Sequence, residues 1–177
     1  VQISQVRGTI TPLTITATEA KLALGEETVR LSIPTFQISD EDWNLNGTAT
    51  FINSQNAPPM LTVSGSALPI SIQHLVNILP EPWRPDSVHT ILTKRDIDGE
   101  MELLTGSVNW IGDEANTVMS EGVIRVAKGH VLVDPHHPPL THLSGSVVFG
   151  ANLVRVLNAK ATLENSKLLV QEATLEW

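Results

Sequence analysis

The sequence predicts a mainly β protein with a minor α-helical part, in which antiparallel strands follow one another as a meander. The first observation behind this prediction is a short pattern whose clearest copy is Leu-Ser-Gly-Ser-Val-Val-Phe at residues 143–149. Further copies stand at residues 6–12, 45–51, 63–69 and 104–110. Each copy alternates apolar and polar positions, as a half-buried strand does.

The second observation is the spacing of the pattern. Its glycines are Gly8, Gly47, Gly65, Gly106 and Gly145, so three of the four intervals are 39 to 41 residues. Self-similarity at a fixed period indicates a repeating architecture. The third observation is composition: aromatic residues are only 4% of the chain and Tyr is absent. The apolar residues are therefore aliphatic and often β-branched, which suits sheets.

Residues 1–69 are predicted to form only strands. Alternating apolar positions occur at 22–24, 29–33, 36–38, 43–51 and 61–67, separated by turn signals at 25–27, 39–42 and 53–59. Residues 100–177 repeat this design. Strands are expected at 104–110, 118–126, 130–133, 143–149, 153–163 and 167–175, with turns at 112–113, 128–129, 134–135, 150–152 and 164–166.

Between these two segments the apolar period changes to that of a helix. Ser71 can cap a helix over residues 72–79, which Pro80 ends. Asp86 can cap a second short helix that reaches about residue 97. We therefore divide the chain into strand repeats at 1–69, a helical insertion at 70–99 and strand repeats at 100–177, as one continuous domain. The ends resemble strands, so we expect a section of a longer protein.

Charge and composition exclude several functions. The net charge is −8, and no basic cluster exceeds Lys94-Arg95, which argues against a nucleic-acid partner. Because Cys is absent, there is no disulfide framework, thiol nucleophile or Cys-ligated zinc. No apolar run approaches the roughly 18 residues of a membrane span.

No motif indicates catalysis. Asp134, His136, His137 and His142 are the one metal-like cluster, but the three prolines among them indicate a stiff, solvated loop. Residues 40–42 are acidic without the spacing of a calcium loop, and no Gly-x-Ser-x-Gly elbow is present. We therefore expect no enzyme activity, no cofactor and no metal. Helix 70–79 lacks Lys and Arg on its polar face, so it is expected to cover a sheet end rather than a membrane.

From about residue 70 to 177 the chain resembles the AsmA-like family of bacterial envelope proteins, which includes TamB-like and YhdP-like members. The resemblance is carried by Leu-Val-Asn-Ile-Leu-Pro at 75–80 with Trp83, by residues 90–103, by Gly-Val-Ile-Arg-Val-Ala-Lys-Gly at 122–129 and by Pro-Leu-Thr-His-Leu-Ser-Gly-Ser-Val-Val-Phe at 139–149, continuing to Ala161 and Leu163.

The resemblance implies an elongated, strongly curved sheet that forms a repeating β-groove with an apolar concave face. It also implies a periplasmic location, an inner-membrane anchor elsewhere in the full-length protein, and non-catalytic transport of phospholipid between the inner and outer membranes. The implied partners are phospholipid, the membrane through other parts of the protein, and other envelope proteins.

Each repeated Gly leaves a gap in an apolar face, which admits a backbone, a bulky neighbour or a ligand, or else marks a bulge. An acyl chain gains about 0.8 kcal/mol per methylene removed from water, so aliphatic lining alone can bind it. The expected lipid-contacting residues flank the glycines: Val6, Ile10, Leu45, Ala49, Val63, Ala67, Leu104, Val108, Leu143 and Val147.

Three alternatives remain open. These residues can instead fill the closed core of a β-sandwich. The chain can be a binding or scaffolding module, for adhesion or carbohydrate, with an aromatic platform at Trp43, Trp83 or Trp110. Metal bound by His136, His137 and His142 would favour an enzyme.

Overall fold

The computed structural model describes residues 2–3, 6–10, 13–40, 43–74, 90, 94–113, 115 and 117–177. These residues are almost entirely β-strand. The strands are β1 (Gln2–Ile3), β2 (Val6–Ile10), β3 (Leu13–Leu24), β4 (Thr28–Ser39), β5 (Asn44–Ser54), β6 (Ala57–Ser71), β7 (Asp98–Ile111), β8 (Thr117–Val131), β9 (Leu140–Gly150), β10 (Leu153–Leu163) and β11 (Ser166–Glu176).

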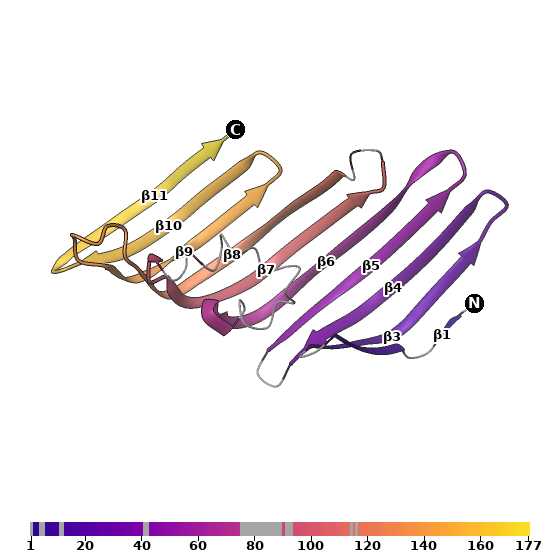
Figure 1. Ribbon diagram of the computed structural model, residues 1–177, viewed down its shortest axis with the longest axis horizontal. Coiled ribbons are helices and arrows are strands. Elements are labelled where there is room, and N and C mark those ends of the chain that lie inside the picture. The colour runs from indigo at the N-terminus through magenta and orange to yellow at the C-terminus, as the bar shows by residue number, and fades with distance from the viewer. Residues whose placement is uncertain are drawn as a thin grey trace. The chain divides into compact units, whose positions relative to one another are not determined.

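The strands belong to one antiparallel sheet that follows the order of the chain. Nine long strands, β3 to β11, form a meander (Figure 1). The short strands β1 and β2 both pair with β3. The prediction of a mainly β, antiparallel meander is therefore confirmed. Short turns, such as Gly25 to Glu27 between β3 and β4, suffice for this topology because each strand reverses beside its predecessor.

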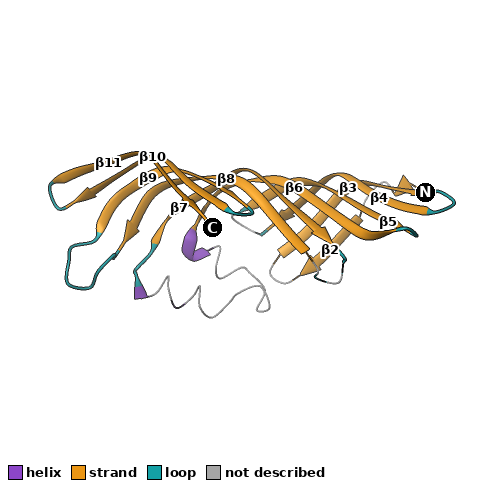
Figure 2. Cartoon of the chain, turned by 90° about the horizontal axis from the view of Figure 1, so that it is seen from above, coloured by secondary structure: helices purple, strands orange, loops and turns teal. Residues whose placement is uncertain are grey.

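The chain divides into two compact units. Unit 1 comprises Val1–Leu68 and Thr105–Gly122, and unit 2 comprises Pro69–Leu104 and Val123–Trp177. The strands of each unit form a single layer in the edge view of Figure 2. Few side chains are buried: among the described residues, the buried apolar ones are Ala17, Ala20, Phe36, Ala67 and Ile70.

The prediction of a strongly curved sheet is wrong, because the sheet is not strongly curled. Bulges and glycine kinks at defined positions introduce curvature into a sheet. Here Gly47 lies directly opposite Gly65, and the pairing of β5 with β6 runs without a shift from Leu45 to Ile52. The two repeated glycines of this pair therefore sit in regular ladder positions and do not bend the sheet sharply.

The predicted turn at Lys128-Gly129 is also wrong, since both residues lie inside the single strand β8. Lys128 has a φ of 53°, the left-handed conformation that turns also use. Asn158 in β10 has a φ of 51°, and there the register between β9 and β10 shifts between Leu157 and Lys160. A left-handed residue followed by a small one thus occurs within a strand as well as at a reversal.

The predicted helix start at Ser71 is confirmed. Residues 72–74 are helical, and the backbone N–H of His74 donates to Oγ of Ser71 at 3.0 Å. This is the bond that an N-cap serine makes to the third residue of its helix. Residues 90 and 94 are helical too, but most of the predicted helical pair, at 75–89 and 91–93, lies outside the described residues.

Removing this cap is expected to weaken the folded state. Replacing Ser71 by Ala removes the Oγ that accepts the His74 N–H, and the expected loss in unfolding free energy is about 1 kcal/mol. Urea denaturation measures the loss. Ser71→Asp keeps an acceptor at the same position and should restore stability; if it is as unstable as Ser71→Ala, the cap is not the cause.

Candidate functional site: an accessible apolar face

The cross-strand register of unit 1 gathers its apolar side chains on one side of the sheet. Directly paired residues of antiparallel strands point to the same face. Ile38 lies opposite Ile15 and Leu45, and Ala49 lies opposite Ile33 and Val63. We call this side the apolar face of unit 1. Its described members on β3 to β6 are Ile15, Ala17, Leu22, Leu24, Val29, Leu31, Ile33, Phe36, Ile38, Leu45, Ala49, Phe51, Leu61, Val63 and Ala67.

The opposite side of the same strands, the polar face, carries mainly hydroxyl and amide groups. Thr50 lies opposite Ser32 and Thr62, and Asn46 lies opposite Gln37 and Ser66. A sheet with one apolar and one polar face normally buries the apolar one against another layer. The asymmetry therefore identifies the face on which unit 1 can bind something apolar.

Strand β7 continues this two-sided pattern. The hydroxyl of Thr62 donates to Oδ1 of Asn109 at 2.8 Å, which places Asn109 on the polar face. Because side chains alternate along a strand, its neighbour Val108 lies on the apolar face. Val108 is 42% exposed.

Unit 2 has a corresponding apolar face on β9 to β11. Val147 lies opposite Val156, which in turn lies opposite Ala173, and Phe149 lies opposite Val154. The described members are Leu140, Leu143, Gly145, Val147, Phe149, Val154, Val156, Ala159, Ala161, Leu163, Leu168, Val170, Ala173 and Leu175.

This face of unit 2 is not sealed by the described part of the chain. All of its residues on β9 and β10 are half-buried, and those on β11 are exposed, with Leu175 at 63%. The inner face of a β-sandwich is instead packed against a second sheet. The described residues form one sheet and no second one. They therefore do not form the closed core of a β-sandwich.

The residues predicted to contact lipid take the following positions. Leu45, Ala49, Val63 and Ala67 lie together on the apolar face of unit 1, and Val108 joins them there. Leu143 and Val147 lie in β9 on the apolar face of unit 2, and Leu104 is half-buried in β7. The backbone of β2 pairs with β3, with Val6 opposite Ala17 and Ile10 opposite Leu13.

The prediction missed more of the face than it named. It took only residues that flank the repeated glycines, although Ile33, Phe51 and Val156 occupy equivalent positions. The period-two alternation of β4, β5 and β10 was the signal that could have found them.

The gaps left by the repeated glycines are used in two ways. A Cβ on Gly47 would come within 2.7 Å of Cζ of Phe36 and 2.4 Å of the carbonyl oxygen of Ser64, so the ring of Phe36 fills this gap. Gly145 has a φ of 158° and lies opposite the bulge at Asn158. The first gap therefore admits a bulky neighbour, and the second marks a bulge.

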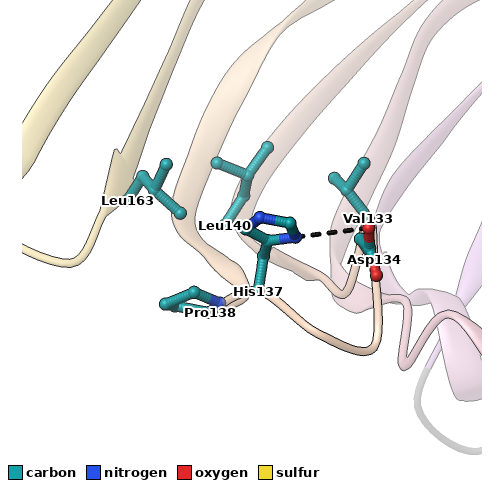
Figure 3. A pocket seen from close by; sticks show the side chains of 6 residues that line it. All are labelled: Val133, Asp134, His137, Pro138, Leu140 and Leu163. Atoms are coloured by element: carbon teal, nitrogen blue, oxygen red, sulfur yellow. Dashed lines mark ion pairs between the residues drawn. The ribbon is translucent and has the colours of Figure 1, made fainter.

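The loop that carries Asp134, His137 and Pro138 lies at one edge of a pocket in unit 2 (Figure 3). The pocket has a volume of about 310 Å³ and is lined by Val133, Asp134, His137, Pro138, Leu140 and Leu163. Nδ1 of His137 lies 3.2 Å from Oδ2 of Asp134. Within the described residues, no group of three His, Asp or Glu side chains is placed to hold a metal ion.

The other candidates contribute little. Nε1 of Trp43 donates to the carbonyl oxygen of Leu68 at 3.1 Å, Trp110 is half-buried, and Trp83 lies outside the described residues. Asp40 closes a turn, because its Oδ1 accepts the N–H of Trp43 at 2.8 Å. In the described part of the chain, no helix is both long and apolar enough to cross a membrane.

Comparisons with known proteins found no similar protein. No protein-family model matches the sequence, and neither the curated proteins nor the solved structures give a significant match.

Proposed function

We propose that this chain is a non-catalytic segment of a bacterial envelope protein that binds phospholipid acyl chains on its apolar face and so conducts lipid between the inner and outer membranes. The observation that carries the proposal is the aliphatic face of unit 2, whose residues on β9 to β11 are half-buried or exposed; on the corresponding face of unit 1, Ala17, Phe36 and Ala67 are buried. The resemblance of residues 70–177 to AsmA-like proteins supports the periplasmic location and an inner-membrane anchor elsewhere in the full-length protein.

The chemistry of the face favours a lipid over a protein partner. Energetic centres of protein interfaces are rich in Trp, Tyr and Arg. On β3 to β6 and β9 to β11 the faces defined above contain none of these, although Trp110 on β7 lies on the same side as Val108, and the chain has no Tyr at all. An acyl chain needs no directional partner, because each buried methylene contributes about 0.8 kcal/mol by itself.

The two-sided sheet also suits the other half of a phospholipid. A charged head group remains favourable only in water, since desolvating an isolated charge is very costly. A single layer with one open side lets acyl chains lie on aliphatic side chains while head groups stay in solvent. The polar face, with Ser32, Thr50 and Thr62 in one cross-strand row, remains hydrated on the other side.

The proposal predicts that phospholipid accompanies the purified protein. The chain, expressed in the periplasm and purified without detergent, should yield phospholipid on organic extraction, identified by mass spectrometry. A periplasmic β-protein with a closed core, purified in parallel, sets the background. Phospholipid at or below this background would contradict the proposal.

A further inference from the structure

The pocket of unit 2 lies where the apolar face ends. Leu140 and Leu163 are directly paired across β9 and β10, and both line the pocket. Val133 and Pro138 complete its apolar part. Its volume of about 310 Å³ is at the lower end of the usual range for ligand pockets, about 300–1,000 Å³. The pocket is therefore continuous with the face proposed to hold acyl chains.

One side of this pocket is polar and held in place. Oδ2 of Asp134 contacts Nδ1 of His137 at 3.2 Å, and Oδ1 accepts the backbone N–H of His136 at 2.9 Å. The backbone N–H of His137 also donates to the carbonyl oxygen of Asp134 at 3.1 Å. Both carboxylate oxygens are thus engaged within the loop.

The ring of His137 is oriented by this contact. Figure 3 shows the imidazole between Leu140 and Asp134, with its bond to Asp134 marked. Nδ1 faces the carboxylate, and no partner among the described residues contacts Nε2. In the protonated imidazole both ring nitrogens carry an N–H, so Nε2 can then donate a hydrogen bond to a ligand carboxylate that enters the pocket.

A positive charge contacts one of the lining residues, although Arg95 is exposed and does not itself line the pocket. The guanidinium of Arg95 donates from Nη1 to the carbonyl oxygen of Val133, a lining residue. The backbone supports this position, since the N–H of Leu132 donates to the carbonyl oxygen of Arg95 at 2.6 Å. A planar guanidinium retains further donors, and two parallel donors match a carboxylate.

We infer that this pocket binds the head of a single-chain amphiphile of the fatty-acid class. The carboxylate lies between Arg95 and His137, and the alkyl chain passes Leu140 and Leu163 onto the apolar face. The inference deepens the proposed function and rests on it for the use of the apolar face as a lipid surface.

The test is calorimetric titration of the protein with dodecanoate below its micellar concentration. His137→Ala and Arg95→Gln each remove one charge-assisted or hydrogen-bonding partner and should weaken binding about tenfold. His136→Ala is the matched control: His136 is the adjacent histidine and is exposed, as His137 is, but it does not line the pocket, so the affinity of the variant should equal that of the parent. Dodecanol, which has the same chain without the charge, should bind at least tenfold more weakly.

The inference is overturned if His137→Ala and Arg95→Gln bind dodecanoate as the parent does, if His136→Ala weakens binding equally, or if dodecanol binds as tightly. This result is separable from the proposed function, because phospholipid extracted from His137→Ala protein should stay at the parent level. If the parent protein carries no phospholipid above background but still binds dodecanoate, the proposed function is contradicted, whereas the inference about the pocket is not.

Discussion

Val147→Asp should lower the phospholipid bound to the purified protein about tenfold or more. Val147 lies in the middle of β9 on the apolar face, directly opposite Val156. A carboxylate there must either lose water beneath an acyl chain or keep the chain away, and the first is very costly. The bound lipid is measured by extraction and mass spectrometry, per mole of protein.

The adjacent residue supplies a matched control. Val148 is also half-buried, but it points to the other face and lies opposite Arg155. Val148→Asp introduces the same charge in the same strand and places it opposite a cation, where opposite charges stabilise a cross-strand pair. Lipid content should remain at the parent level. Equal loss in both variants would show that the effect comes from the fold and not from the face.

Phe36→Ala should lower the free energy of unfolding by about 3 kcal/mol, near the lower end of values for Phe truncation in a core. Phe36 is 7% exposed and is the largest side chain among the described buried residues. Its ring covers Gly47, where the gap would reopen on truncation. Urea denaturation followed by circular dichroism measures the change.

The neighbouring Gln37 controls for the position in β4. It is exposed on the polar face, opposite Thr16 and Asn46, so Gln37→Ala should change stability by less than about 0.5 kcal/mol. A loss below 1 kcal/mol for Phe36→Ala would mean that the ring does not anchor unit 1.

Local alternation was enough to predict which side of a strand is apolar. Leu45, Ala49 and Phe51 occur at even spacings in the sequence, and the structure places them on one face. The same reasoning located the start of the helix, because the hydroxyl of Ser71 acts within a single turn. Features set by neighbours along the chain are therefore accessible from the sequence.

Features that depend on the pairing between strands could not be predicted from the sequence. The partners of Ile33 depend on a register shift between Ile33 and Phe36, beside Pro34, which has no N–H to give the ladder. The sequence could not show whether the chain turns at Lys128 or continues there as strand β8, because both arrangements can use a residue in the left-handed conformation. The pocket joins a loop residue, His137, to Leu163 of β10, and only the pairing of β9 with β10 brings them together.

The most direct test of an apolar face open to lipid is photo-crosslinking from both faces. A photoreactive amino acid is placed at Val63 or Val147, on the apolar faces, and at their neighbours Ser64 or Val148, on the opposite side. The protein is irradiated in the bacterial envelope, and the mass of each adduct is determined. We expect phospholipid adducts at positions 63 and 147 and none at 64 and 148. Protein adducts in place of lipid at 63 and 147, or equal lipid labelling of both faces, would contradict the account.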